Sequence, residues 1–176
     1  MTIIIGIDIG LTGAISRVGP GLQPVVVDIP TVPDGEPKAG RGKTPFQPMR
    51  IHGRQLLTML RELVPAGHVV LAVFEDVRAR PMHNDNVQFN SFHSQNSLVL
   101  SRGVIQAVLD IAGIKTEAVQ PQTWKRLYGL SGADKKDSLD KARVLFPGLA
   151  GDLSRVRDHN RAESLLIANY GLKKLT

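Results

Sequence analysis

The chain has 176 residues, and this length predicts one domain that spans residues 1–176. Hydrophobic residues make up 42% and cysteine is absent, which excludes an intrinsically disordered chain, disulfides, thiolate zinc sites and a cysteine nucleophile. The formal net charge is +6 and the isoelectric point is about 9.9, a balance typical of proteins that bind polyanions.

The sequence shows neither a membrane-spanning stretch nor a secretory leader. No segment approaches the roughly 18–20 unbroken apolar residues of a membrane helix. The first eight residues lack a basic leader and carry an acid inside their apolar run, unlike a signal peptide. With cysteine absent, these features predict an intracellular, cytoplasmic protein that does not engage a membrane.

The first part of the chain favours strands. Residues 3–9 are β-branched and apolar on both faces, which is typical of a strand buried in the centre of a sheet. Residues 14–18 and 24–29 predict two further strands in a meander. Proline and glycine in residues 30–48 predict a mobile loop, and the apolar spacing of residues 55–64 predicts an amphipathic helix.

Strands and helices alternate in the rest of the chain. A strand is expected at 69–75, a polar segment at 78–94 and a helix at 97–112. The remaining predicted elements are a strand at 115–119 and helices at 121–128, 133–146 and 160–170. This order predicts an α/β fold in which helices cover the faces of a mixed sheet.

Carboxylates in apolar surroundings are the main chemical signal of the sequence. Asp8 lies between Ile7 and Ile9 in the first predicted strand, where an unpaired charge would cost several kcal/mol to bury. Glu75 ends a second apolar strand in the same way. Because both strands finish in an acid, they can bring the two carboxylates to one edge of a sheet.

A third acid lies on the core-facing side of the last predicted helix. At about 100° per residue, Glu163 falls inside the apolar stripe, and Asp158 and His159 lie at the helix entrance. Oxygen ligands from separate elements favour a hard divalent cation such as Mg²⁺ or Mn²⁺. Two such ions about 4 Å apart can activate water and stabilise the leaving oxygen in phosphodiester hydrolysis.

Each acid also has a structural alternative. Asp8 can cap the following turn or pair with a buried arginine, and Asp158 can serve as a helix N-cap. Glu163 can pair with Arg161 or reach solvent, and Glu75 can begin a loop. The four acids together are harder to explain in this way than any one of them alone.

Three motifs that contain these acids resemble those of a nuclease family. Residues 6–13 (GIDIGLTG), 73–77 (VFEDV) and 158–168 (DHNRAESLLIA) resemble, in order and spacing, the acidic motifs of RuvC-type Holliday junction resolvases. The last motif is most similar to the phage and prophage branch. The resemblance implies an RNase H-like fold with a five-stranded mixed sheet flanked by helices. It also implies a homodimer that nicks four-way or related branched DNA in pairs, with two Mg²⁺ or Mn²⁺ ions per active site, in a bacterial or phage-infected cell.

The resemblance also implies roles for residues outside the acidic motifs. Lys125 and Lys135 are similar to two lysines beside the scissile phosphate, although Lys135 also fits the alternating charges of a solvated helix. Trp124 is expected to pack in the core. The helix at 97–112 resembles the family's dimerisation element, and its apolar residues are otherwise plain core. Contacts to nucleic acid are expected at Lys125, Lys135, Arg78, Arg80, Phe89 and Phe92.

The two aromatic residues of the polar segment have alternative roles. Phe89 and Phe92 can stack at the junction crossover, where stacking is worth roughly 1–3 kcal/mol per base. Either residue can instead pack at the start of the next helix. The residue types alone leave both interpretations open.

One position departs from the family pattern. The family commonly carries an acid or a histidine three residues before the last acid, where this chain has Asn160, a poor metal ligand. Asp158 is the expected replacement, and His159, on the same helical face as Glu163, is the alternative. The expected catalytic residues are Asp8, Glu75, Asp158, Glu163, Lys125 and Lys135.

Three other functions stay open at the level of sequence. Residues 8–12 also resemble the phosphate loop of actin-like and sugar-kinase-like phosphotransferases, which need two such lobes and a much longer chain. A second alternative is an RNase H-like nuclease that acts on RNA, such as a ribosomal-RNA processing enzyme. A third is a basic DNA-binding module without catalysis, which would leave the buried carboxylates unexplained.

Overall fold

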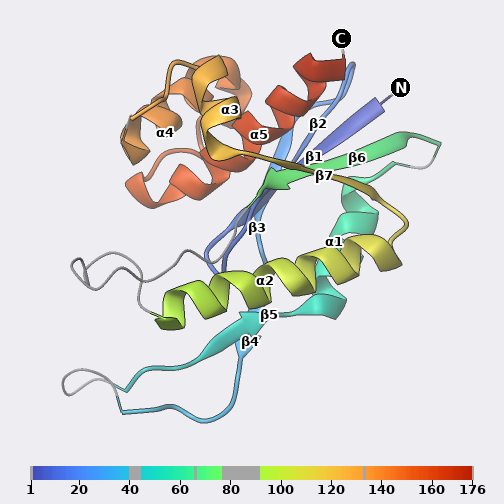
Figure 1. Ribbon diagram of the computed structural model, residues 1–176. Coiled ribbons are helices and arrows are strands. Elements are labelled where there is room, and N and C mark those ends of the chain that lie inside the picture. The colour runs from blue at the N-terminus through green and yellow to red at the C-terminus, as the bar shows by residue number, and fades with distance from the viewer. Residues whose placement is uncertain (1, 40–44, 66, 77–91, 133, 176) are drawn as a thin grey trace.

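Five strands form one mixed sheet in the computed structural model, which describes residues 2–39, 45–65, 67–76, 92–132 and 134–175 (Figure 1). The order across the sheet is β3-β2-β1-β6-β7. β1 pairs antiparallel with β2 and parallel with β6, β2 pairs antiparallel with β3, and β6 pairs parallel with β7. The strands are β1 (Thr2–Asp8), β2 (Ala14–Val18), β3 (Val25–Asp28), β6 (Val69–Glu75) and β7 (Lys115–Val119). The predicted mixed sheet is confirmed, with β1 at its centre.

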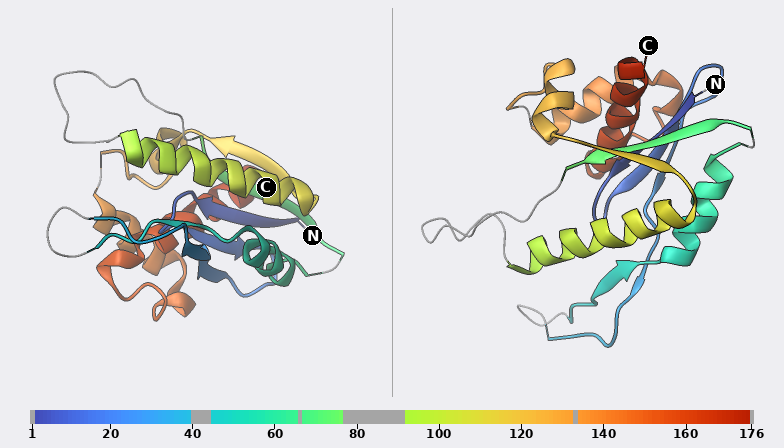
Figure 2. Two further views of the ribbon diagram at one scale, coloured as in Figure 1. Left: turned by 90° about the horizontal axis from the view of Figure 1, so that it is seen from below. Right: turned by 45° about the vertical axis from the view of Figure 1, so that its right-hand side comes forward.

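Helices cover both faces of this sheet (Figures 1 and 2). One face carries α1 (Gly53–Leu63) and α2 (Phe92–Ile111), and the other carries α3 (Pro121–Leu127), α4 (Lys135–Leu145) and α5 (His159–Leu175). Short 3-10 turns, η1 (Pro147–Leu149) and η2 (Val156–Asp158), connect α4 to α5. None of the described helices has the length and apolar character that crossing a membrane requires.

Side chains of β1 alternate between the two faces, as the pleat of a strand dictates. Ile4 packs into the core beneath α5, whereas Ile3 and Ile5 pack into the core beneath α1 and α2. The side chains of these three isoleucines are fully buried. A strand with core on both sides must be apolar at nearly every position, which is the pattern visible in the sequence.

Two glycines allow α5 to approach the sheet closely. A Cβ on Gly6 would collide with the carbonyl oxygen of Ser164. A Cβ on Gly171 would lie 2.8 Å from Cγ2 of Val73 and 3.0 Å from Cγ2 of Ile4. The start of α5 therefore lies over the later part of β1, and its end lies over the earlier part. The helix runs antiparallel to β1 and delivers its N-terminal turns to the carboxyl edge of the sheet.

Part of the segment predicted as a mobile loop, residues 30–48, pairs as a ribbon. β4 (Thr31–Pro33) pairs antiparallel with β5 (Met49–Ile51), and a bridge between Lys38 and Phe46 extends the pairing. The loop prediction missed β4 because proline does not exclude an edge strand, in which its missing N–H need not pair.

The helix predicted at 97–112 begins earlier than its apolar pattern indicates. α2 starts at Phe92 and ends at Ile111. Its first turns extend beyond the sheet in Figure 1, and residues 94–96 there are polar and not buried. Hydrophobic periodicity detects the part of a helix that packs on a core, and it is silent about a part that does not.

Candidate active site at the carboxyl edge of the sheet

Two acids lie beside one another where the parallel strands end. Asp8 and Glu75 are the last residues of β1 and β6, and the residues before them, Ile7 and Phe74, are register partners. The residues two positions earlier in each strand face α5, so alternation places both acids on the α5 side of the sheet. The structure thus brings Asp8 and Glu75 to one edge, as the strand ends predict.

Glu163 reaches this edge from the other direction. It lies near the start of α5, in the part of this helix that covers the carboxyl end of β1. Its Oε1 atom accepts a hydrogen bond of 3.2 Å from the hydroxyl of Ser138 on α4 and lies 3.7 Å from Nζ of Lys125. Three acids from two strands and one helix therefore meet on the α5 side.

The charges of neighbouring carboxylates act on the pKa values of Asp8 and Glu75. Burial raises the pKa of Asp8 well above its usual value, and the charges of Glu163 and Glu75 raise it further. The ammonium groups of Lys125 and Lys135 oppose this rise. Burial likewise raises the pKa of Glu75. Repulsion of this kind is relieved when a cation binds between the acids, and such clusters are typical of functional sites.

α3 places an aromatic residue and a lysine against the acids. It begins just after β7, whose Val119 is the register partner of Glu75. Trp124 is fully buried, which confirms its expected packing role, and its Nε1–H donates a hydrogen bond of 2.8 Å to Oε1 of Glu75. Lys125 pairs with Glu163, and its Nζ lies 5.1 Å from the centroid of the Trp124 ring. The Trp124–Glu75 bond is a site contact that the sequence analysis missed.

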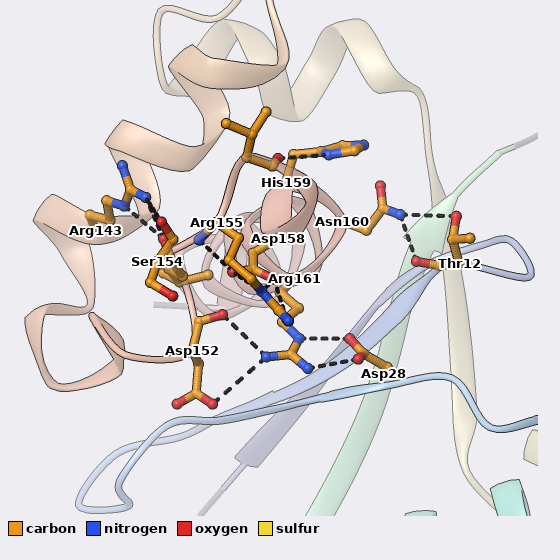
Figure 3. A network of polar contacts seen from close by, with 12 residues as sticks. Thr12, Asp28, Arg143, Asp152, Ser154, Arg155, Asp158, His159, Asn160 and Arg161 are labelled. Carbon is orange, nitrogen blue, oxygen red and sulfur yellow. Dashed lines mark hydrogen bonds and ion pairs between the residues drawn. The ribbon is translucent and has the colours of Figure 1, made fainter.

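Asp158 takes part in an ionic network with Arg155 (Figure 3). Its carboxylate is only 3% exposed and accepts 2.7 Å hydrogen bonds from the backbone N–H and the Nη2 of Arg155. The Arg155 guanidinium lowers the pKa of Asp158 below its usual value. The neighbouring Arg161 binds Asp28 on β3 at 2.6 Å. Arg155 engages both carboxylate oxygens of Asp158, so Asp158 would have to leave this ion pair to serve as the expected fourth ligand.

His159 and Asn160 begin α5 beside the turn that follows β1. Asn160 donates hydrogen bonds from Nδ2 to the backbone oxygen of Thr12 at 2.6 Å and to its Oγ1 at 3.1 Å. Nδ1 of His159 lies 3.2 Å from the backbone oxygen of Val156, and Figure 3 shows its ring pointing away from Arg155. His159 lies one helical turn before Glu163 and shares its face of α5.

The remaining expected contacts to nucleic acid are placed only in part. Lys135 is the exposed first residue of α4, after the N-cap residue Asp134. Phe92 is the first residue of α2, and its side chain lies outside the described part of the chain. Arg78, Arg80 and Phe89 also lie outside the described residues.

The three carboxylates are of the chemical type that binds a hard divalent cation, although the described side chains do not surround a common point where an ion could sit. Among the described residues, no group of three or more histidine and acidic side chains is arranged to hold a metal ion. The ammonium group of Lys125 supplies part of the positive charge that balances the Glu163 carboxylate. The acids offer oxygen ligands only, and burial together with the charges of Glu163 and Glu75 raises the pKa of Asp8. This donor chemistry fits a hard divalent cation.

The pKa of Asp8 predicts how the stability of the metal-free protein depends on pH. Folding raises this pKa, so the stabilising contribution is complete below the unfolded pKa of about 3.9 and is lost as pH rises through the folded pKa. Asp8→Asn removes the charge and is expected to raise the melting temperature relative to wild type at pH 8 but not at pH 4. Thermal circular dichroism in EDTA measures this difference, and a difference independent of pH would contradict the prediction.

The arrangement of sheet and helices is shared with solved structures of RuvC. No protein-family model matches the chain. A stretch of 73 residues, 41% of this chain, is 40% identical to part of the Holliday junction resolvase MOC1, chloroplastic, of Chlamydomonas reinhardtii, and it covers 8% of that protein. The chain superimposes on T. thermophilus RuvC in complex with a Holliday junction substrate with a TM-score of 0.53 and 12% identity, over 94% of this chain and 90% of that chain. For another Thermus thermophilus RuvC structure the TM-score is 0.51 and the identity 14%, over 98% and 96% of the two chains. The chain thus has the RuvC architecture, an RNase H-like fold.

Proposed function

We propose that this chain is a metal-dependent, structure-selective endonuclease that resolves four-way (Holliday) or related branched DNA by paired nicking. The observation that carries the proposal is the convergence of Asp8, Glu75 and Glu163 at the carboxyl edge of a RuvC-like sheet. The partial similarity to a chloroplastic Holliday junction resolvase and the RuvC structure bound to a junction support this class of substrate. The motif of residues 158–168 favours the phage and prophage branch.

Asp8, Glu75, Glu163 and His159 are the residues assigned to hold two Mg²⁺ or Mn²⁺ ions. When bound, such ions activate water and stabilise the charge of the leaving oxygen. Asp8 would be a central ligand of the site, because the charges of both other acids act on it. His159 is assigned the ligand role first expected for Asp158. It shares a helical face with Glu163, whereas the Asp158 carboxylate accepts hydrogen bonds from Arg155.

Lys125 and Lys135 are assigned to bind and orient the scissile phosphate. Lys125 is half-buried beside the acids, and Lys135 is exposed at the start of α4. Both ammonium groups act on the pKa of Asp8, so a phosphate bound between them would lie close to the acids. The net charge of +6 provides longer-range attraction for a polyanion.

A homodimer through α2 accounts for paired nicking. Residues 100, 104, 107 and 111 follow the i, i+4, i+7, i+11 spacing of one helical stripe, and all four are apolar. Leu100 is 61% exposed, Val104 37% and Ile111 70%. A contiguous apolar stripe of this kind is typical of a protein contact.

In sedimentation velocity the wild type is expected to be a dimer and Leu100→Glu a monomer, and a monomeric wild type would contradict the assignment.

One incubation tests the proposed function directly. The purified protein is mixed with a synthetic four-way DNA junction, a linear duplex of the same sequence and a structured RNA, each with Mg²⁺ or with EDTA. We expect symmetric nicks in the junction with Mg²⁺ and none in the linear duplex or in EDTA. Preferential cleavage of the RNA would favour the ribosomal-RNA processing alternative. Tight ATP binding without cleavage would favour the phosphotransferase alternative.

Two variants distinguish His159 from Asp158 as the fourth ligand. His159→Ala is expected to reduce cleavage by about 10²-fold or more and to raise the Mg²⁺ concentration needed for half-maximal rate, with little change in melting temperature. Asp158→Asn is expected to lower the melting temperature by several degrees, because it weakens the buried contact with Arg155. Its cleavage rate below the melting transition should stay near that of wild type. A loss of cleavage in Asp158→Asn at unchanged stability would return Asp158 to the metal site.

A further inference from the structure

Trp124 has a buried polar contact that its packing role does not require. The side chain is fully buried in the core beneath α5, and it is the one tryptophan of the chain. Its indole N–H points at Oε1 of Glu75 with a separation of 2.8 Å. A phenylalanine or leucine would fill a core position without this bond, so the tryptophan contributes a donor as well as volume.

A second acid of the cluster is held in the same manner. The hydroxyl of Ser138, which is buried, donates to Oε1 of Glu163 at 3.2 Å. Within the described residues, the hydrogen bonds to Glu75 and Glu163 all go to Oε1 and none goes to Oε2. Each carboxylate thus has Oε1 held by a neutral donor, with Nζ of Lys125 also 3.7 Å from Oε1 of Glu163, which leaves Oε2 for a cation.

The neutral character of the donor matters for metal binding. Asp158 shows the contrasting case, in which a guanidinium engages both oxygens and supplies a positive charge. An indole N–H orients a carboxylate but leaves its negative charge uncompensated. Hydrogen bonds of this kind to a ligating carboxylate fix its rotamer before the ion arrives, and their loss typically weakens metal binding about 10–100-fold.

We propose that Trp124 is a positioning residue for a divalent cation, because its indole N–H fixes Oε1 of Glu75 and leaves the second carboxylate oxygen for the ion. This inference rests on the proposed function, in which Glu75 is a metal ligand. Trp124 does not touch the ion or the substrate. Its effect is therefore expected on the affinity for the metal rather than on the binding of DNA.

The test removes the N–H and keeps the ring. Trp124 is replaced by 3-benzothienylalanine, in which sulfur takes the place of the indole N–H, and Trp124→Phe is a second variant. Mn²⁺ binding to the DNA-free protein is measured by electron paramagnetic resonance of free Mn²⁺. Both variants are expected to bind Mn²⁺ about 10–100-fold more weakly than wild type. The sulfur analogue should keep a melting temperature in EDTA close to that of wild type.

Tyr128→Phe is the matched control. Tyr128 follows α3 directly, is buried, and its hydroxyl donates to the backbone oxygen of Leu166 at 3.2 Å. The variant removes a buried donor from the same segment without touching an acid, so its Mn²⁺ affinity should equal that of wild type. An equal loss in this variant would show a general loosening of α3 and would overturn the inference.

A double-variant cycle with Glu75→Ala completes the test. If Trp124 acts through Glu75, the sulfur analogue causes no further loss of Mn²⁺ affinity once Glu75 is alanine. A further loss in that background would overturn the positioning role. An unchanged affinity of the single analogue would overturn this inference alone. A wild-type protein that does not bind Mn²⁺ would overturn both this inference and the proposed function.

Discussion

Asp8→Asn is expected to reduce junction cleavage in Mg²⁺ by about 10³-fold or more while junction binding survives. Asp8 is the acid whose pKa both Glu75 and Glu163 raise, so it lies where the negative charge of the cluster is greatest. Asparagine keeps the shape of the side chain and removes the charge that a divalent cation requires. Single-turnover cleavage in Mg²⁺ and gel-shift binding in Ca²⁺ measure the two properties separately.

A matched control for Asp8→Asn is the same substitution away from the site. Asp140 lies on α4, is exposed, and pairs with Arg143 at 3.0 Å. Asp140→Asn should change cleavage by less than about threefold, because an exposed ion pair contributes little. A rate for Asp8→Asn within tenfold of wild type would show that the metal assignment is wrong.

Gly6→Ala is expected to destabilise the protein by about 3 kcal/mol or more. The added Cβ would collide with the backbone of α5 at Ser164, which cannot rotate away as a flexible side chain can. To relieve the collision α5 must move away from β1, which separates Glu163 from Asp8. The free energy of unfolding from urea denaturation and the affinity for Mn²⁺ should therefore fall together.

Gly103→Ala is the control for this prediction, and it is expected to change the stability in the opposite direction. Gly103 lies within α2, and a Cβ at this position would meet no atom within 4 Å. Alanine in a helix interior is more favourable than glycine by roughly 0.5–1 kcal/mol, so this variant should be slightly more stable than wild type. A Gly6→Ala protein as stable as wild type would mean that α5 does not depend on close contact at β1.

Local patterns in the sequence predicted most of the elements, because a strand or helix that packs on a core must carry a repeating apolar face. β1 is apolar on both sides and is central, and the Glu163 stripe does face the sheet. The pattern was silent where segments leave the core, at the first turns of α2 and in the β4–β5 ribbon. These segments have few buried residues, so hydrophobic periodicity contains no signal for them.

The sequence by itself determined which acids are out of place in apolar surroundings, and three of them, Asp8, Glu75 and Glu163, meet at one edge. Only the tertiary structure decided their partners. It paired Asp158 with Arg155 and connected the indole of Trp124 to Glu75. The physical reason is that burial cost is a property of one residue in its own element, whereas a hydrogen bond of 2.8 Å depends on how two separate elements are placed.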